Sequence, residues 1–203
     1  ELSEQKDAFL GQISHELRTP MTSIRSFSEI LKDSDQYDDE TVRRFSLIIH
    51  NESIRLTKLL DEILDLSFLE HGEIKLNFVN IHFHEVLERA LNATQVIIQQ
   101  NSTKVKVSDQ LNSLYLKTDP DRLSQVLINL ISNANIANQN KRISIEFDAK
   151  LDDKQLKIYI KDNGIGIILD YADLIFEQFA KFSTNHNTGS AGLCLSISRE
   201  IIK

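Results

Sequence analysis

The first third of the chain carries a helical repeat of apolar residues that is almost free of helix breakers. Only Gly11 and Pro20 interrupt residues 7–70, and apolar residues recur three or four positions apart on both sides of a polar stretch at 33–39. This spacing places the apolar side chains on one face of a helix. The sequence therefore predicts two long helices joined by a short loop, with a bend in the first helix at Pro20.

Two helices in a hairpin cannot enclose the apolar stripe that they share. The predicted helices cover residues 4–33 and 42–71, and Gly72 suits the C-terminal end of the second helix. Packing against a second copy would bury both stripes in a four-helix bundle. We therefore expect residues 1–72 to form a dimeric helical hairpin, which makes the chain a homodimer.

The rest of the chain, residues 73–203, alternates between strand-like and helical patterns. Period-two or short apolar runs predict strands at 74–79, 104–107, 113–117, 142–149 and 155–161. Apolar residues at helical spacing predict helices at 84–100, 121–135 and 193–203. The sequence thus predicts an α+β domain with helices over one face of a mixed sheet.

Composition and charge exclude several classes of function. The formal net charge of −7 offers no basic field for nucleic acid. No apolar run reaches the length of about 18 residues that a membrane-spanning helix needs, and the charged first residues lack the core of a signal peptide. Cys194 is the single cysteine, so an internal disulfide is excluded and a reducing, cytoplasmic compartment fits.

A histidine stands on the polar side of the first predicted helix. Ile13 and Leu17 share the apolar face, and His15 lies roughly 200° around the helix from Ile13. The carboxylate of the next residue, Glu16, can orient one ring nitrogen and favour proton loss during nucleophilic attack. Thr19 lies four residues on and therefore shares the face of His15. Taken alone, such a histidine is most often simply solvated.

Glycines in the last quarter of the chain allow a ligand to approach the backbone closely. Gly164 and Gly166 follow a predicted strand and stand beside Asp162, whose carboxylate can accept a hydrogen bond from an amino group. Gly192 closes a run of small residues that opens the last predicted helix, and such a helix start suits a phosphate group. Each stretch alone is also compatible with an ordinary turn.

Two asparagines lie four residues apart on the predicted helix 121–135. Asn129 and Asn133 would therefore project from its polar side. Their amide oxygens suit a hard cation that also holds phosphate oxygens. The alternative is that both are solvated or capping residues.

These stretches together resemble a known family. Residues 9–20, FLGQISHELRTP, closely resemble the H-box of the sensor histidine kinases of two-component signalling. Residues 119–134, 162–167, 175–179 and 192–197 resemble, in order, the N, G1, F and G2 boxes of the same family's catalytic domain. The resemblance implies an N-terminal αα-hairpin in a dimeric four-helix bundle, followed over 73–203 by an α/β sandwich of the Bergerat ATP-binding type that is truncated at its C-terminus.

The resemblance also implies the reaction. His15 would accept the γ-phosphate of ATP with Glu16 as neighbouring acid or base, and would pass it to an aspartate on the receiver domain of a response regulator. Thr19 would position a water when the domain dephosphorylates that partner. The parent protein would reach a membrane only through regions absent from this chain.

The same resemblance assigns the nucleotide site. Asp162 would bind the adenine amino group, and Asn133 with Asn129 would hold Mg²⁺ and the phosphates of ATP. A mobile lid would run from Phe179 to Ser190. The remaining nucleotide contacts would be Gly164, Gly166, Phe179, Lys181 and Gly192.

The chain departs from the family pattern at two places. Ile136 and Ala137 stand where a lysine and an aromatic residue are usual, which removes one cation and one ring that stacks on adenine. Cys194 replaces a glycine and adds a side chain near the backbone. These departures leave open a catalytically degenerate scaffold or phosphotransfer module that docks a response regulator without ATP turnover. A gyrase-like ATPase without phosphotransfer would leave the hairpin unexplained.

Overall fold

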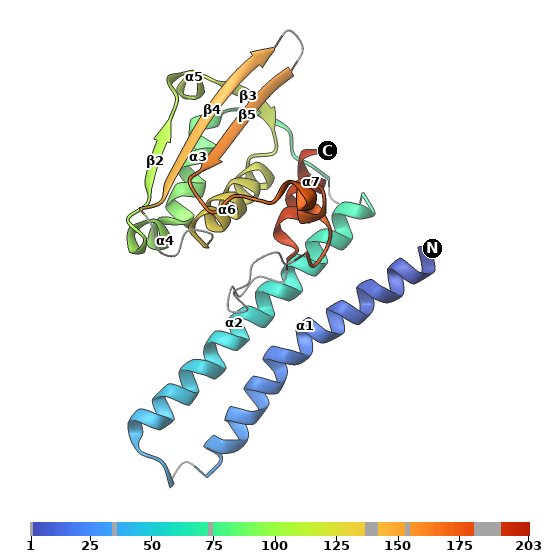
Figure 1. The fold of residues 1–203 in the computed structure, drawn as a ribbon, viewed down its shortest axis with the longest axis vertical. Coiled ribbons are helices and arrows are strands. Elements are labelled where there is room, and N and C mark those ends of the chain that lie inside the picture. Colours follow the sequence, from blue (N-terminus) through green and yellow to red (C-terminus); the bar gives the residue numbers. More distant parts are fainter. Residues whose placement is uncertain (1, 34–35, 73–74, 137–141, 153–154, 181–191) are drawn as a thin grey trace. The chain divides into compact units, whose positions relative to one another are not determined.

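The computed structural model describes residues 2–33, 36–72, 75–136, 142–152, 155–180 and 192–203, with side chains from residue 7 onwards. The chain divides into two compact units (Figure 1). One unit consists of Glu1–Ser67 with Glu177–Leu193, and the other of Phe68–Phe176 with Cys194–Lys203. Within the described residues, no helix is long and apolar enough to cross a membrane.

Two long helices make up most of the first unit and confirm the predicted hairpin. Helix α1 is Leu2–Leu31 and continues through Pro20, and helix α2 is Asp39–Glu70. Helix α2 begins three residues before its predicted start because Asp38 caps it: the Asp38 carboxylate accepts a hydrogen bond from the Thr41 amide at 2.6 Å. This bond holds the pKa of Asp38 below its ordinary value. Gly72 has a φ of +65° just beyond α2, as expected for its C-terminal end.

The second unit contains short strands and helices. Its strands are β1 (Val79–His82), β2 (Lys104–Val107), β3 (Tyr115–Thr118), β4 (Ser144–Asp152) and β5 (Gln155–Asp162). Its helices are α3 (Phe83–Ala93), α4 (Gln95–Gln100), α5 (Asp109–Asn112), α6 (Pro120–Ile136) and α7 (Cys194–Ile202). The 3-10 turns Leu169–Tyr171 and Leu174–Phe176 follow β5.

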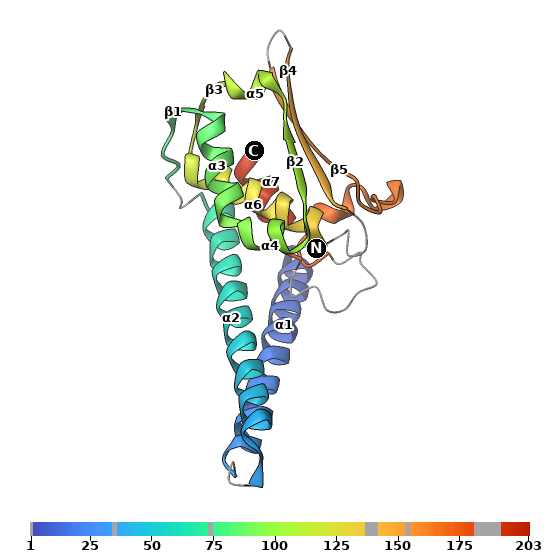
Figure 2. The same ribbon diagram turned by 90° about the vertical axis from the view of Figure 1, so that its left-hand side faces the viewer.

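The strands form two small sheets, and helices cover one face of the larger one. Strand β1 pairs antiparallel with β3, while β2 pairs parallel with β4 and β4 pairs antiparallel with β5. Helices α3, α4 and α6 lie on one side of the β2–β4–β5 sheet (Figures 1 and 2). Ile145, Phe147 and Ala149 of β4 are buried on that side. The predicted α+β domain with a mixed sheet is therefore confirmed.

Three predicted element boundaries are wrong. Residues 75–78 have no regular structure, and the strand expected at 74–79 is instead β1, Val79–His82. The helix expected at 84–100 breaks into α3 and α4 at the buried Thr94, whose hydroxyl donates back to the Ala90 carbonyl at 2.8 Å. The strand expected at 113–117 is β3, Tyr115–Thr118, and the short helix α5 (Asp109–Asn112) precedes it.

Candidate active site

The histidine of the predicted phosphoacceptor motif lies on the exposed surface of α1. His15 and Thr19 are exposed, and Glu16 is half-buried. The Thr19 hydroxyl donates to the His15 carbonyl oxygen at 3.3 Å, which keeps Oγ1 one helical turn beyond the histidine. The exposure of His15 agrees with its predicted place away from the apolar face, and it leaves the imidazole open to an incoming electrophile.

The predicted adenine-binding loop begins at the end of β5. Asp162 is exposed, and its Oδ1 accepts a hydrogen bond from the Gly164 amide at 2.7 Å. That bond turns the loop and leaves Oδ2 as an acceptor for a ligand amino group. Gly166 has a φ of +77°, and no atom lies within 4 Å of the position that a Cβ would occupy. The backbone at Gly166 is therefore open to close approach.

Asn163 holds this loop in place, a role that the sequence analysis missed. Its Nδ2 donates to the Arg142 carbonyl at 2.9 Å, and its Oδ1 accepts from the Ser144 amide at 2.9 Å. These two bonds continue the β4–β5 pairing one residue past its last pair, Ile145 with Asp162. No local pattern could have shown this role, because the two partners lie 19 and 21 positions away in the sequence.

The asparagines of α6 differ in what their amides contact. The Nδ2 of Asn129 donates to the Cys194 carbonyl at 3.2 Å and lies 3.3 Å from the Ser198 hydroxyl. Its Oδ1 is therefore the atom left for a ligand. Asn133, one turn further on, is half-buried. Asn135 is buried and accepts a hydrogen bond from Thr103 at 2.6 Å, so it has a structural role.

The chemistry of this donor set suits a hard divalent cation. Asn129 and Asn133 supply neutral amide oxygens, which Mg²⁺ accepts when phosphate oxygens complete its coordination. Among the described residues there is no group of three or more His, Cys, Asp or Glu side chains that could hold a metal by itself. A cation at this place would therefore depend on a ligand that brings its own charge.

Gly192 packs against the backbone at the end of the F-box. It has a φ of +80°, and a Cβ there would lie 2.7 Å from the Ala180 carbonyl oxygen and 2.8 Å from the Phe179 carbonyl carbon. Phe179 is buried, has a φ of +61°, and places its ring centroid 5.6 Å from that of Phe9 on α1. Lys181 and the rest of the expected lid lie outside the described residues.

The two departures from the family pattern are Cys194 and the pair Ile136 and Ala137, and the structure describes the first more fully than the second. Cys194 is buried in the first turn of α7, and it is not among the described residues with a positive φ. The backbone conformation at this position thus does not require glycine. Ile136 ends α6 and is half-buried, whereas Ala137 lies outside the described residues.

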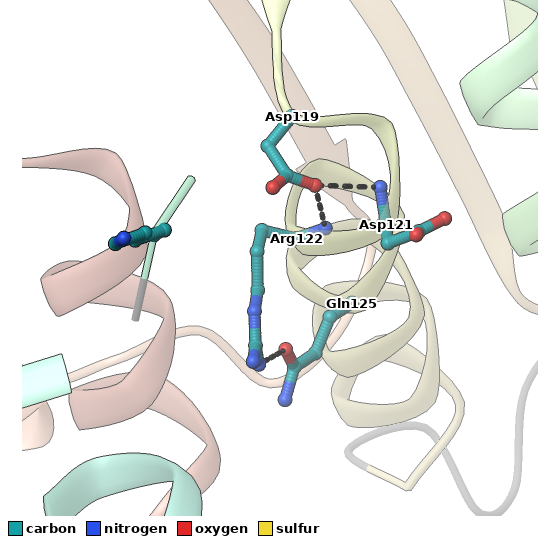
Figure 3. Close-up of a pocket in the computed structure, with 5 residues that line it drawn as sticks. Asp119, Asp121, Arg122 and Gln125 are labelled. Carbon is teal, nitrogen blue, oxygen red and sulfur yellow. Dashed lines mark hydrogen bonds between the residues drawn. The ribbon is translucent and has the colours of Figure 1, made fainter. Parts of the chain in front are cut away.

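A polar pocket of about 280 Å³ lies at the start of α6, and none of the predicted nucleotide contacts is among its lining residues. Its lining residues are Lys75, Asp119, Asp121, Arg122 and Gln125. Figure 3 shows Asp119 over the first turn of the helix, with the Arg122 side chain reaching Gln125 at 2.9 Å. Asp119 bonds to the backbone of Asp121 and Arg122, so this pocket includes the residue that caps α6.

Asp119 is the centre of that cap. Its carboxylate accepts backbone N–H groups of Asn77 at 2.8 Å and of Asp121 and Arg122 at 3.1 Å. Burial alone would raise the pKa of Asp119, but these three donors outweigh it and hold the pKa below its ordinary value. The cap fixes the start of the helix that carries Asn129 and Asn133.

Comparisons with family models match both parts of the chain. Residues 5–72 match the His Kinase A (phospho-acceptor) domain. Residues 118–203 match the histidine kinase-, DNA gyrase B- and HSP90-like ATPase. The two matches fall on the segments that contain His15 and the asparagine and glycine residues described above.

Individual proteins are similar over most or all of the chain. Sensor protein kinase WalK of Staphylococcus aureus is 29% identical over 208 residues, which cover all of this chain and 49% of that protein. The histidine kinase AdeS of Acinetobacter baumannii has a TM-score of 0.72 and 26% identity over 93% of this chain and 85% of the other. Histidine kinase ThkA, solved in complex with response regulator protein TrrA, has a TM-score of 0.69 and 24% identity over 86% of this chain and 50% of that one. The chain spans about a third to a half of the length of the WalK relatives.

Proposed function

The chain belongs to the sensor histidine kinases of two-component signalling, and from this premise we propose that it is the catalytic core that phosphorylates its own His15 with ATP. The phosphoryl group then passes to an aspartate on the receiver domain of a response regulator. The observation that carries the proposal is an exposed histidine with Glu16 beside it on a helical hairpin, joined to a unit whose open loop and paired asparagines suit a nucleotide.

Residues of the segment 73–203 bind the nucleotide in this proposal. The free Oδ2 of Asp162 accepts the adenine amino group, and the open backbone at Gly164 and Gly166 lets the nucleotide approach. The amide oxygens of Asn129 and Asn133 would hold Mg²⁺, which would neutralise phosphate charge. Further contacts to the nucleotide are assigned to Phe179, Lys181 and Gly192.

The reaction at His15 needs positioning more than covalent assistance. A lone pair on one ring nitrogen forms a bond to the γ-phosphorus while the bond from that phosphorus to the bridging oxygen of ADP breaks, and ADP leaves. The other ring nitrogen gives up its proton, and the Glu16 carboxylate accepts it. In a separate reaction, Thr19 orients a water molecule that removes the phosphoryl group from the regulator.

The hairpin supplies the surfaces for two partners. Apolar side chains remain exposed along both helices in the single chain: Leu10, Met21, Leu47, Ile54, Leu60 and Leu64. A second copy that packs on them would complete a four-helix bundle over residues 1–72, with residues 73–203 as the ATP-binding domain. The complex of ThkA with the response regulator TrrA supports a receiver domain as the second partner.

Incubation with Mg²⁺ and γ-labelled ATP tests the proposal. The wild-type protein should gain an acid-labile, base-stable label, and His15→Gln should lose it. His50→Gln is the matched control, because His50 is an exposed histidine on α2. A label that survives in His15→Gln, or a wild-type protein that takes up none while binding ATP, would contradict the proposal.

A further inference from the structure

Helices α6 and α7 are joined by a small hydrogen-bond network at Asn129. The Ser198 hydroxyl donates to the Cys194 carbonyl oxygen at 2.7 Å, one turn back along α7. The Asn129 amide nitrogen lies 3.2 Å from that carbonyl oxygen and 3.3 Å from the hydroxyl oxygen. Ser198 and Cys194 are buried, at 5% and 8% exposed, so water cannot easily replace these bonds.

The network settles which way the Asn129 amide points. A carbonyl oxygen only accepts, so the atom that faces Cys194 must be the Nδ2 donor. The single proton of Ser198 is already directed at Cys194, so Ser198 offers a lone pair to the same Nδ2. A rotation of the amide by 180° would place Oδ1 against the Cys194 carbonyl oxygen, and Ser198 could then donate to Oδ1 only by giving up its own bond to that carbonyl. Oδ1 is thereby held on the side away from α7.

We propose that Ser198 is a positioning residue of the nucleotide site, which keeps the Oδ1 of Asn129 turned towards the bound metal–nucleotide complex. This inference rests on the proposed function, since it concerns the cation that Asn129 and Asn133 would share. Ser198 touches neither the nucleotide nor the metal in this account, and it acts only through Asn129.

Nucleotide binding tests the inference without relying on turnover. Titration calorimetry of ATP with and without Mg²⁺ separates the metal-dependent part of the affinity from the rest. Ser198→Ala should weaken the metal-dependent part about fivefold, the ratio that corresponds to one ordinary hydrogen bond of about 1 kcal/mol. Binding of ATP without Mg²⁺ should stay the same. Ser124→Ala is the control, because it removes a buried hydroxyl from α6 away from this network.

A pair of equally sized variants isolates the hydroxyl. Ser198→Thr keeps it and should restore the metal-dependent affinity relative to Ser198→Val, which has the same bulk without it. The side-chain NH₂ signals of Asn129 in an NMR spectrum give a second readout in the absence of nucleotide. They should shift in Ser198→Ala and stay in place in Ser124→Ala.

The outcomes separate this inference from the proposed function. A wild-type protein that binds no ATP overturns both. A wild-type protein that binds ATP while Ser198→Ala matches it, or loses affinity equally with and without Mg²⁺, overturns the positioning role alone. An unchanged NH₂ signal of Asn129 in Ser198→Ala overturns it as well.

Discussion

The hairpin and the second unit differ in how much apolar surface they bury by themselves. Among the described residues of α1 and α2, only Pro20, Leu59 and Leu66 are buried, and large apolar side chains remain exposed along both helices. The second unit encloses a continuous core between its sheet and its helices, in which Phe83, Ile131 and Ile145 are fully buried. We therefore expect the hairpin to need a partner for its stability, and the second unit to be stable without one.

Removing a core side chain of the second unit should give the largest effect. Phe147 of β4 is 1% exposed, and Phe147→Ala should lower the free energy of unfolding of this unit by about 4 kcal/mol through lost burial and a cavity. Hydrogen exchange followed by mass spectrometry should show lost protection in β4 and β5 and unchanged protection in α2. Tyr159→Ala, on the exposed face of the same sheet, is the control. Equal loss of protection in α2 would show that the two units do not fold independently.

Gly192 and Gly72 both have a positive φ, and alanine substitutions at the two positions give the next comparison. Gly192→Ala combines a strained backbone with a Cβ 2.7 Å from the Ala180 oxygen, and should cost about 3 kcal/mol. Gly72→Ala has a similar φ of +65° but open space, so only strain of about 1 kcal/mol remains. Urea unfolding of both variants measures the difference. Equal midpoints for the two would contradict the close contact of Gly192 with Ala180.

A charged side chain among the exposed apolar residues of the hairpin tests whether the hairpin depends on a second copy. Ile54 is 56% exposed in the single chain, and Ile54→Lys should cost about 2 kcal/mol per protomer if a second copy covers it. Sedimentation should show weaker dimers while the second unit keeps its stability. Lys58→Ala, at another exposed position of α2, should leave the dimer intact. An unchanged dimer in Ile54→Lys would place the interface elsewhere.

Sequence patterns predicted the long helices of the hairpin more accurately than the strands and helices of the second unit, for physical reasons. A stripe repeated over about thirty residues in α1 averages out local exceptions. Strand β1 has only four residues, and its place depends on pairing with β3, which lies more than thirty positions away. The break at Thr94 coincides with a local bond from its hydroxyl to the Ala90 carbonyl, which the apolar spacing used for the helix prediction does not register.

The residues of the candidate site also divide into those whose place local sequence patterns predicted and those whose place they did not. The exposure of His15 followed from helical geometry, and the turn at Asp162 followed from its glycines. The roles of Asn163 and Ser198 depend on partners 19 to 21 and 69 positions away, respectively, so local spacing could not reveal them. The requirement for glycine at 192 rather than at 194 depends on contact with Ala180, which is also distant in sequence.

The aspartates that cap α2 and α6 allow the hairpin and the second unit to be compared by the pH dependence of their stability. This is the smallest of the expected effects. Asp119 accepts three backbone N–H groups, and its pKa lies below the ordinary value of 3.8 in the folded protein. A lowered pKa means that the cap stabilises the fold fully above pH 3.8 and loses this contribution as the pH falls through the folded value. Asp119→Ala should therefore lower the stability of the second unit by about 1 kcal/mol at neutral pH, and by less at pH 3.

Asp38→Ala should show the same sign in the hairpin with a smaller change, because Asp38 is more exposed. Urea midpoints at the two pH values measure both, and a loss at Asp119 that grows towards pH 3 would contradict the assignment of a charged cap.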